Sequence, residues 1–127
     1  SYVSTRAFVW HNVEIGENCF ILEDNTLQPF VEIGNNVVLW SGNHVGHRSI
    51  IKDHCFISSH CVISGYCQIG ESSFLGVNCT LEDHANIAED NFLGAASLVR
   101  KFTAEKEFYQ EKKTEVASID THRLFRL

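Results

Sequence analysis

Two of the seven histidines lie three residues apart in the segment SGNHVGHRS, residues 41–49. A neutral imidazole accepts a proton near neutral pH and also binds transition metals, so His44 and His47 could act as a general base or as metal ligands. An isolated pair at this spacing is a weak signal, because most histidines are surface residues without a catalytic role. The position of the two side chains in the fold therefore decides between these roles.

A strict six-residue repeat organises the chain that carries these histidines. An aliphatic residue recurs at every sixth position without a slip: Val9, Ile15, Ile21, Leu27, Ile33, Leu39, Val45, Ile51, Ile57, Ile63, Ile69, Leu75, Leu81, Ile87, Leu93 and Val99. The residue four positions after each aliphatic is always small. A period of six suits a short strand followed by a tight corner. Three such units make one turn of a triangular parallel β-helix, with the aliphatic and the small residue pointing inward.

This repeat resembles that of the hexapeptide-repeat acyltransferases, whose turns wind as a left-handed parallel β-helix. The resemblance covers about residues 7–103 and implies an all-β fold, a left-handed parallel β-helix of a little over five turns. Generic crossover connections are right-handed, so the expected handedness comes from the resemblance alone. We expect a β-helix domain over residues 1–103 and a C-terminal capping tail over residues 104–127, where charged residues replace the core positions.

Residues eighteen apart should stack on successive turns, which sorts the outer faces of the expected β-helix. One outer column reads Phe20, Val38, Phe56, Phe74 and Phe92. Such a column on a monomer is a large exposed apolar strip, so we expect a partner subunit or the C-terminal tail to cover it. Members of the resembled family are typically trimers, which favours a homotrimer with sites between subunits.

The five cysteines all occupy the small inward position of the repeat, at Cys19, Cys55, Cys61, Cys67 and Cys79. Cys55, Cys61 and Cys67 fall at three different corners, which disfavours a disulfide or a shared metal. A thiol buried in apolar surroundings also has a raised pKa and low reactivity. We therefore expect the cysteines to fill the core, and we expect no covalent acyl-cysteine step.

A closer resemblance is to sugar acetyltransferases of the sialic acid O-acetyltransferase type, including bacterial sugar N-acetyltransferases. The motifs that carry it are His47, the pair Ser64-Gly65, FLGVN at residues 74–78 and LGAAS at residues 93–97. The resemblance implies direct transfer of an acetyl group from acetyl-CoA to a hydroxyl or amine of a sugar or sugar nucleotide. It makes His47 the expected general base, with His44 as the alternative, and such a base typically contributes about 10²–10⁴ in rate.

The same register implies the residues that contact acetyl-CoA. The candidates are Phe56, Gly65, Val77 and Ala95, to which we add Arg100 and Lys101 as ligands for the CoA phosphates. Gly65 lies eighteen residues beyond His47, where a bare backbone N–H could approach the thioester. Arg48 stands where the relatives often carry a glutamate that orients the base. No metal is expected.

Charge and hydropathy argue against several other classes of protein. A net charge of −6 and the lack of a Lys/Arg-rich block argue against nucleic-acid or anionic-membrane partners. The sequence has no apolar run of membrane-spanning length and no charged-then-apolar leader, so we expect a cytoplasmic protein. The N-terminal Rossmann-like domain that relatives often carry is not expected in this chain.

Two further interpretations stay open at this point. A γ-carbonic-anhydrase-like metalloenzyme gathers three histidines at a subunit boundary, and His11 and His47 lie two expected turns apart on one corner. The position that would complete this set holds Lys52, which makes zinc the less favoured alternative. A non-catalytic β-helix scaffold is the other alternative, since a fold by itself does not specify an activity.

Overall fold

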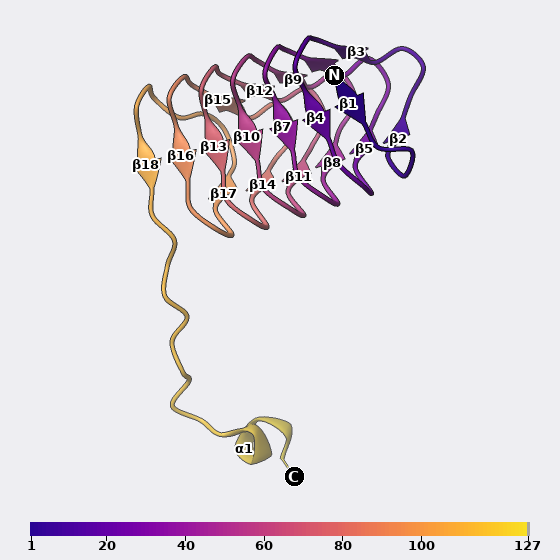
Figure 1. Ribbon diagram of the computed structural model, residues 1–127. Coiled ribbons are helices and arrows are strands. Elements are labelled where there is room, and N and C mark those ends of the chain that lie inside the picture. The colour runs from indigo at the N-terminus through magenta and orange to yellow at the C-terminus, as the bar shows by residue number, and fades with distance from the viewer. Residues whose placement is uncertain (127) are drawn as a thin grey trace.

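The computed structural model describes residues 1–126 and is a parallel β-solenoid with three sheets (Figure 1). Up to β17 the chain moves to the next sheet after every two-residue strand, so strands that pair there are three strands apart in the chain. We call the sheets A, B and C in the order in which the chain first meets them. The three edges of the prism are then the A–B, B–C and C–A corners.

Each sheet stacks one strand from every turn. Sheet A contains β1 (Tyr2–Val3), β4 (Phe20–Ile21), β7 (Val38–Leu39), β10 (Phe56–Ile57), β13 (Phe74–Leu75), β16 (Phe92–Leu93) and β18 (Phe108–Tyr109). Sheet B contains β2 (Phe8–Val9), β5 (Thr26–Leu27), β8 (His44–Val45), β11 (Val62–Ile63), β14 (Thr80–Leu81) and β17 (Leu98–Val99). Sheet C contains β3 (Glu14–Ile15), β6 (Glu32–Ile33), β9 (Ile50–Ile51), β12 (Gln68–Ile69) and β15 (Asn86–Ile87).

The core confirms the six-residue repeat. Partners in neighbouring strands are eighteen residues apart, as in the pairing of His44 with Val62, and the second residue of each strand points inward. From Ile21 to Leu93 every aliphatic of the repeat is between 0% and 4% exposed. Complete burial of one such side chain contributes about 1.5–3 kcal/mol. The stacked aliphatic rows therefore supply most of the driving force for the fold.

The corners share one backbone feature that fixes where their side chains point. The third residue after each aliphatic usually has a positive φ, as at Arg48 (58°), Tyr66 (60°) and His84 (65°). Asn and Asp tolerate this left-handed conformation best among residues with a side chain, and they fill several of these positions. Because the conformation repeats, side chains at equivalent corner positions of successive turns lie in parallel columns.

The solenoid has six turns, one strand longer at each end than the sequence pattern had indicated. At the N-terminus, β1 pairs with β4 one six-residue step before the first expected strand. At the C-terminus, the corner after Val99 is two residues shorter, so Phe102 forms a bridge with Asn86 and Thr103 is buried. Tyr109 then takes the next inward position, where β18 pairs with β16.

The start of the remaining C-terminal segment, at Gln110 and Glu111, borders a hollow at the last turn, and the rest leads away from the solenoid (Figure 1). Residues 110–126 are all exposed, and they extend from the end of the prism to a short helix, α1 (Thr121–Phe125) (Figure 1). The side chain of Asp120 caps α1 by accepting a hydrogen bond from the N–H of Arg123 at 2.8 Å. No helix in residues 1–126 is long and apolar enough to cross a membrane.

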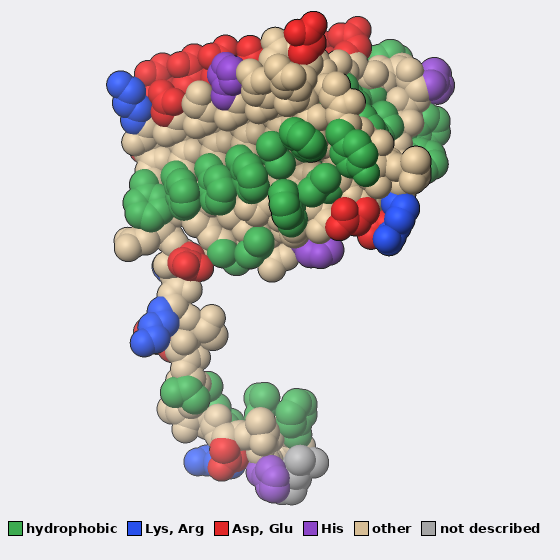
Figure 2. All heavy atoms as spheres, in the orientation of Figure 1, with side chains coloured by type: hydrophobic (Ala, Val, Ile, Leu, Met, Phe, Trp, Pro, Cys, Tyr) green, Lys and Arg blue, Asp and Glu red, His purple; other side chains and the backbone are tan. Residues whose placement is uncertain are grey.

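An aromatic ladder runs along the outside of sheet A, as the sequence pattern predicted. Phe56, Phe74 and Phe92 stack with ring centroids 5.4 Å and 4.6 Å apart, and Phe108 continues the row. Figure 2 shows this row of hydrophobic side chains along the outer face of the sheet. Phe92 is 45% exposed and Phe108 is 64% exposed. The C-terminal tail, one of the two expected covers, does not lie along this face (Figure 1).

The cysteines are free and buried, as expected for residues that fill the core. Burial raises the pKa of Cys55 to about 11. The sequence argument missed one relationship, because Cys61 and Cys79 are eighteen residues apart and stack at the A–B corner. A hydrogen bond with Cys79, together with burial, raises the pKa of Cys61. Both effects favour the protonated thiol and oppose a nucleophilic role.

Candidate functional site

His47 lies on the B–C corner, directly beside the backbone of Gly65 on the next turn. A β-carbon added to Gly65 would lie 2.8 Å from Cε1 and 3.0 Å from Nε2 of the imidazole. Real β-carbons essentially never approach so closely, so the missing side chain leaves the space that the ring occupies. The sequence-based placement of Gly65 above His47 therefore agrees with the structure.

The N–H of Gly65 already has a partner in this structure. It donates a hydrogen bond to Oδ1 of Asp83, which lies one turn further along the same corner, at 2.9 Å. Below it, the hydroxyl of Ser49 donates to the carbonyl of Ser64 at 2.7 Å and accepts from the N–H of Cys67 at 3.1 Å. These bonds fix the backbone on both sides of Gly65. Hence the contribution of Gly65 visible here is space for the imidazole, and its N–H is held by a carboxylate.

Arg48, which replaces the expected orienting glutamate, does not turn toward His47. Its guanidinium carbon lies 4.4 Å from the centroid of the Phe30 ring, on the preceding turn. This distance suits a cation–π contact. On the next turn, the ring of Tyr66 meets the His47 ring edge to face, with centroids 5.1 Å apart and planes at 85°. The candidate base is therefore flanked by an aromatic ring rather than by a carboxylate.

His44, the alternative base, lies in β8 on the outer face of sheet B. Its neighbours across the sheet are Thr26 and Val62, and its side chain is exposed. It thus lies between the two corners that border sheet B, three positions before His47 along the chain. Both histidines can reach a ligand on this side of the prism.

The candidate acetyl-CoA contacts gather on the opposite edge of sheet B, at the A–B corner. Phe56 and Val77 line one open pocket of about 270 Å³ together with Trp40, Ser58 and Ser59. This volume is slightly below the range of about 300–1,000 Å³ that is usual for small-molecule pockets. The apolar walls and two hydroxyl groups suit a pantetheine arm.

Ala95 belongs to the same corner, one turn beyond Val77. A β-carbon on Gly76 would lie 2.8 Å from the backbone nitrogen of Ala95, so the two turns approach closely at this point. Ala95 also borders a hollow formed with Leu98 and Tyr109 at the C-terminal end of the solenoid. The structure therefore brings Phe56, Val77 and Ala95 to one corner.

Arg100 and Lys101 form the shortened B–C corner of the last turn. Arg100 donates to Oε2 of Glu82 at 2.5 Å, and both side chains are largely exposed. The two cations lie three layers from His47, which corresponds to about 14 Å at the usual strand spacing. They lie on the B–C corner, as His47 does, whereas Phe56 lies beside the A–B corner.

The candidate residues are thus divided between two corners of one protomer. Equivalent positions on successive corners, such as Ser59 and Gly65, are six residues apart, which an extended chain spans in at most about 20 Å. An acceptor proton and a thioester carbonyl must meet at hydrogen-bonding distance of one base. Within one chain, the two sets of candidate residues lie on the two corners that border sheet B.

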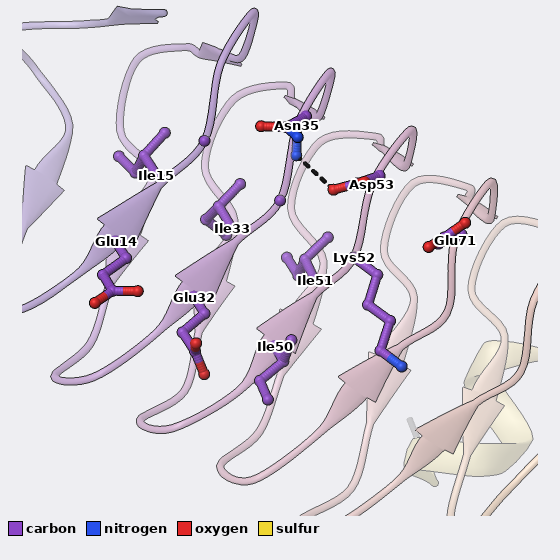
Figure 3. Close-up of a pocket in the computed structure, with 12 residues that line it drawn as sticks. Glu14, Ile15, Glu32, Ile33, Asn35, Ile50, Ile51, Lys52, Asp53 and Glu71 are labelled. Atoms are coloured by element: carbon purple, nitrogen blue, oxygen red, sulfur yellow. Dashed lines mark hydrogen bonds between the residues drawn. The ribbon is translucent and has the colours of Figure 1, made fainter.

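A further hollow lies on sheet C and was not indicated by the sequence. Figure 3 shows Glu14, Glu32 and Ile50 projecting from β3, β6 and β9 along it. At its rim, Oδ1 of Asp53 accepts a hydrogen bond from the backbone N–H of Asn35 at 2.7 Å. The hollow is lined by sheet C and by the C–A corner, which carries none of the candidate site residues, and its carboxylates disfavour an anionic ligand such as CoA.

Sequence reasoning did not single out Tyr66, His84 or Trp40, although each borders a predicted site residue. The signal was present, because Tyr66 and His84 follow Arg48 at eighteen-residue intervals. His11 and His47 do lie two turns apart on the B–C corner. Within residues 1–126, however, no group of three or more His, Cys, Asp or Glu side chains could hold a metal ion.

Comparisons with known proteins agree with this architecture. Residues 12–47 and 30–65 match the family described as bacterial transferase hexapeptide (six repeats). No curated protein matches the sequence. Among solved structures, the acetyltransferase domain of PglB from Neisseria gonorrhoeae is 18% identical with a TM-score of 0.82, covering 84% of this chain and 52% of that one.

Two further structures show the range of the likeness. A mutant of perosamine N-acetyltransferase from Caulobacter crescentus, in complex with CoA and GDP-perosamine, is 21% identical with a TM-score of 0.82, covering 84% of this chain and 50% of that one. A mutant of AntD, an N-acyltransferase from Bacillus cereus, is 13% identical with a TM-score of 0.55, covering 98% and 83%. This chain spans about half the length of the first two. Residues 12–65 thus carry the repeats of the bacterial transferase hexapeptide family, within a hexapeptide-repeat β-solenoid that continues through all six turns.

Proposed function

We propose that this protein transfers an acetyl group from acetyl-CoA to an amine or hydroxyl of a sugar or sugar nucleotide, with His47 as general base. The observation that carries the proposal is the packing of the exposed His47 imidazole against Gly65. A ring in this position has free access to solvent and a defined place on the prism. His44 is the second candidate for the base, because it is exposed on the adjacent sheet.

His47 is assigned two proton transfers, one from the acceptor and one to the departing CoA thiolate. As the acceptor nitrogen or oxygen attacks the thioester carbonyl, the imidazole takes the proton that the acceptor loses. The new C–N or C–O bond forms, the C–S bond of the tetrahedral intermediate breaks, and the imidazolium returns the proton to the departing CoA thiolate. No covalent enzyme intermediate is needed, in keeping with the buried state of the cysteines.

Acetyl-CoA would lie against the A–B corner. Phe56, Val77 and Ala95 offer apolar contacts for the pantetheine arm, and Ser58 and Ser59 offer hydroxyl groups for its amides. Gly65 would border the thioester from the B–C corner, where an oxyanion must displace Asp83 to use its N–H. Arg100 and Lys101 are the candidate ligands of the CoA phosphates, and Arg100 would exchange its partner Glu82 for a phosphate.

The division of these residues between two corners favours a site completed by a second copy. One protomer would present His47 at its B–C corner, and its neighbour would present the pocket at its A–B corner. Two different surfaces then meet, which is a heterologous contact, and such contacts form a ring when the rotation between copies closes. We therefore propose a homotrimer, with the aromatic ladder of sheet A buried in the assembly.

The acceptor class rests on the solved structures and the motifs together. The Caulobacter crescentus protein is named as a perosamine N-acetyltransferase and was solved with CoA and GDP-perosamine. This favours an amino sugar as the acceptor here. The motif resemblance to sialic acid O-acetyltransferases keeps sugar hydroxyl groups within the proposed class.

A binding and turnover assay tests the proposal directly. Acetyl-CoA at millimolar concentration should raise the melting temperature, because a ligand that binds only the folded state stabilises it. CoA thiol should then appear when free or nucleotide-linked amino sugars are added. Metal analysis of the same sample distinguishes the metalloenzyme alternative, which requires stoichiometric zinc. Neither a shift nor thiol release with any acceptor would point to the scaffold alternative.

A further inference from the structure

The ring of His47 is held by packing rather than by hydrogen bonds. Within residues 1–126, His54 is the only histidine whose ring takes part in a side-chain hydrogen bond. Around His47 the structure shows Gly65 on the next turn and the ring of Tyr66, 5.1 Å away at 85°. A histidine that acts as a base commonly depends on a neighbouring group to orient its ring. Here the neighbouring group that could orient the ring is Tyr66.

Tyr66 is tied to His47 through the backbone as well as through its ring. Its N–H donates to the carbonyl of His47 at 2.9 Å. The next turn repeats the bond, with the N–H of His84 donating to the carbonyl of Gly65 at 3.0 Å. Tyr66 and His84 share the same left-handed backbone conformation, with φ of 60° and 65°. Their side chains consequently leave the corner in the same direction.

The rings of Tyr66 and His84 form a stacked pair as a result. Their centroids are 5.0 Å apart and their planes meet at 13°. Stacking on His84 therefore holds the plane of the Tyr66 ring. In this orientation the Tyr66 ring meets the His47 ring edge to face. On the preceding turn, Arg48 is drawn to Phe30, which keeps the guanidinium out of this arrangement.

We infer that Tyr66, stacked on His84, is the positioning residue that holds the His47 imidazole in the orientation needed for proton transfer. The inference rests on the proposed function of His47 as the base. Edge-to-face packing with Tyr66 and the close backbone of Gly65, both on the next turn, together restrict rotation of the imidazole. The phenol hydroxyl has no part in this role, because the contact is made by the ring.

The test compares Tyr66→Leu, which removes the ring, with Tyr66→Phe, which keeps it. Tyr66 is 47% exposed, so neither change should alter folding, and melting temperatures check this. Phe102→Leu, at an aromatic side chain that is 76% exposed, is the matched control. The readouts are kcat and KM for acetyl-CoA, and the proton NMR shifts of the His47 ring in each variant.

Tyr66→Leu should lower kcat by up to about tenfold with KM for acetyl-CoA unchanged, and Tyr66→Phe should match the wild type. The ring-current displacement of the His47 signals should vanish in Tyr66→Leu and persist in Tyr66→Phe and Phe102→Leu. Unchanged His47 signals in Tyr66→Leu, or equal kcat in all variants, would overturn the inference. If the wild type transfers no acetyl group, the proposed function fails, and the NMR comparison alone decides whether Tyr66 holds His47.

Discussion

A β-carbon on Gly65 would lie 2.8 Å from Cε1 of His47, so this glycine and this imidazole are direct neighbours on successive turns of the solenoid. Gly65 does not have a positive φ, and its backbone conformation is open to other residues. The requirement for glycine is therefore one of space. Any side chain at this position must displace the imidazole, since the backbone here is fixed by bonds to Asp83 and to the neighbouring strands.

Gly65→Ala tests this relationship. The new methyl group meets the end of a flexible side chain rather than backbone, so the protein should fold and its melting temperature should barely change. Displacing the base by about 1 Å can cost about 10² in rate, so kcat should fall on that order. In the His47→Ala background the same change should cost nothing further. An additional loss in the double variant would show that Gly65 acts independently of His47.

The proposed site between subunits predicts complementation between two inactive variants. His47→Ala removes the base at the B–C corner, and Val77→Asp places a charge in the pocket at the A–B corner. Each variant alone should be inactive. In mixed oligomers, about one site in four should combine the intact corner of one variant with the intact corner of the other, and activity should recover to that extent. Mixed samples that stay inactive would place the whole site within one chain.

Phe92→Glu should dissociate the oligomer while the chain stays folded. Phe92 stacks on Phe74 on the outer face of sheet A and is 45% exposed, so the folded monomer does not need it, whereas a buried interface would not accept a charge. Light scattering during gel filtration measures the mass, and circular dichroism checks the fold. Phe102→Glu is the matched control. A monomeric wild type would refute the proposed assembly.

Stability should fall as the pH rises from about 9 to about 11. Burial raises the pKa of Cys55 from 9.0 to about 11, so in this window the unfolded chain releases a proton that the folded chain keeps. Each pKa unit corresponds to about 1.4 kcal/mol, which makes the expected loss about 2–3 kcal/mol. Urea unfolding measures it. Cys55→Ser, which copies Ser73 on the next turn, should remove part of this dependence, and an identical profile would contradict the assignment.

The sequence allowed the repeating part of the fold to be predicted, because each six-residue step carries its own aliphatic and small residue. From that regularity alone, Gly65 is predicted to lie beside His47 and every cysteine to lie in the core. The same rule could not predict the last turn, where the step from Val99 to Thr103 is four residues instead of six. There, the partly buried Tyr109 packs against the core and its hydroxyl donates to the exposed Glu107, a pair that a search for aliphatics overlooks.

The site was only partly predictable for a different reason. The eighteen-residue spacing predicts which residues stack on successive turns. The direction of each side chain depends instead on the groups that it contacts. Arg48 turns to Phe30 and the N–H of Gly65 donates to Asp83, and although each partner is eighteen residues away, spacing alone does not show that these contacts form. The separation of His47 from Phe56 onto two corners did follow from the register. This separation across sheet B is the reason for proposing a site completed by a second copy.

The most direct test of the account is acetyl transfer by wild type, His44→Ala and His47→Ala, followed as CoA thiol release with an amino-sugar acceptor. The account predicts acceptor-dependent release by the wild type and a kcat lower by about 10²–10⁴ in His47→Ala, with melting temperature and acetyl-CoA binding retained. His44→Ala should lose much less. Equal turnover by wild type and His47→Ala would contradict the assignment of the base.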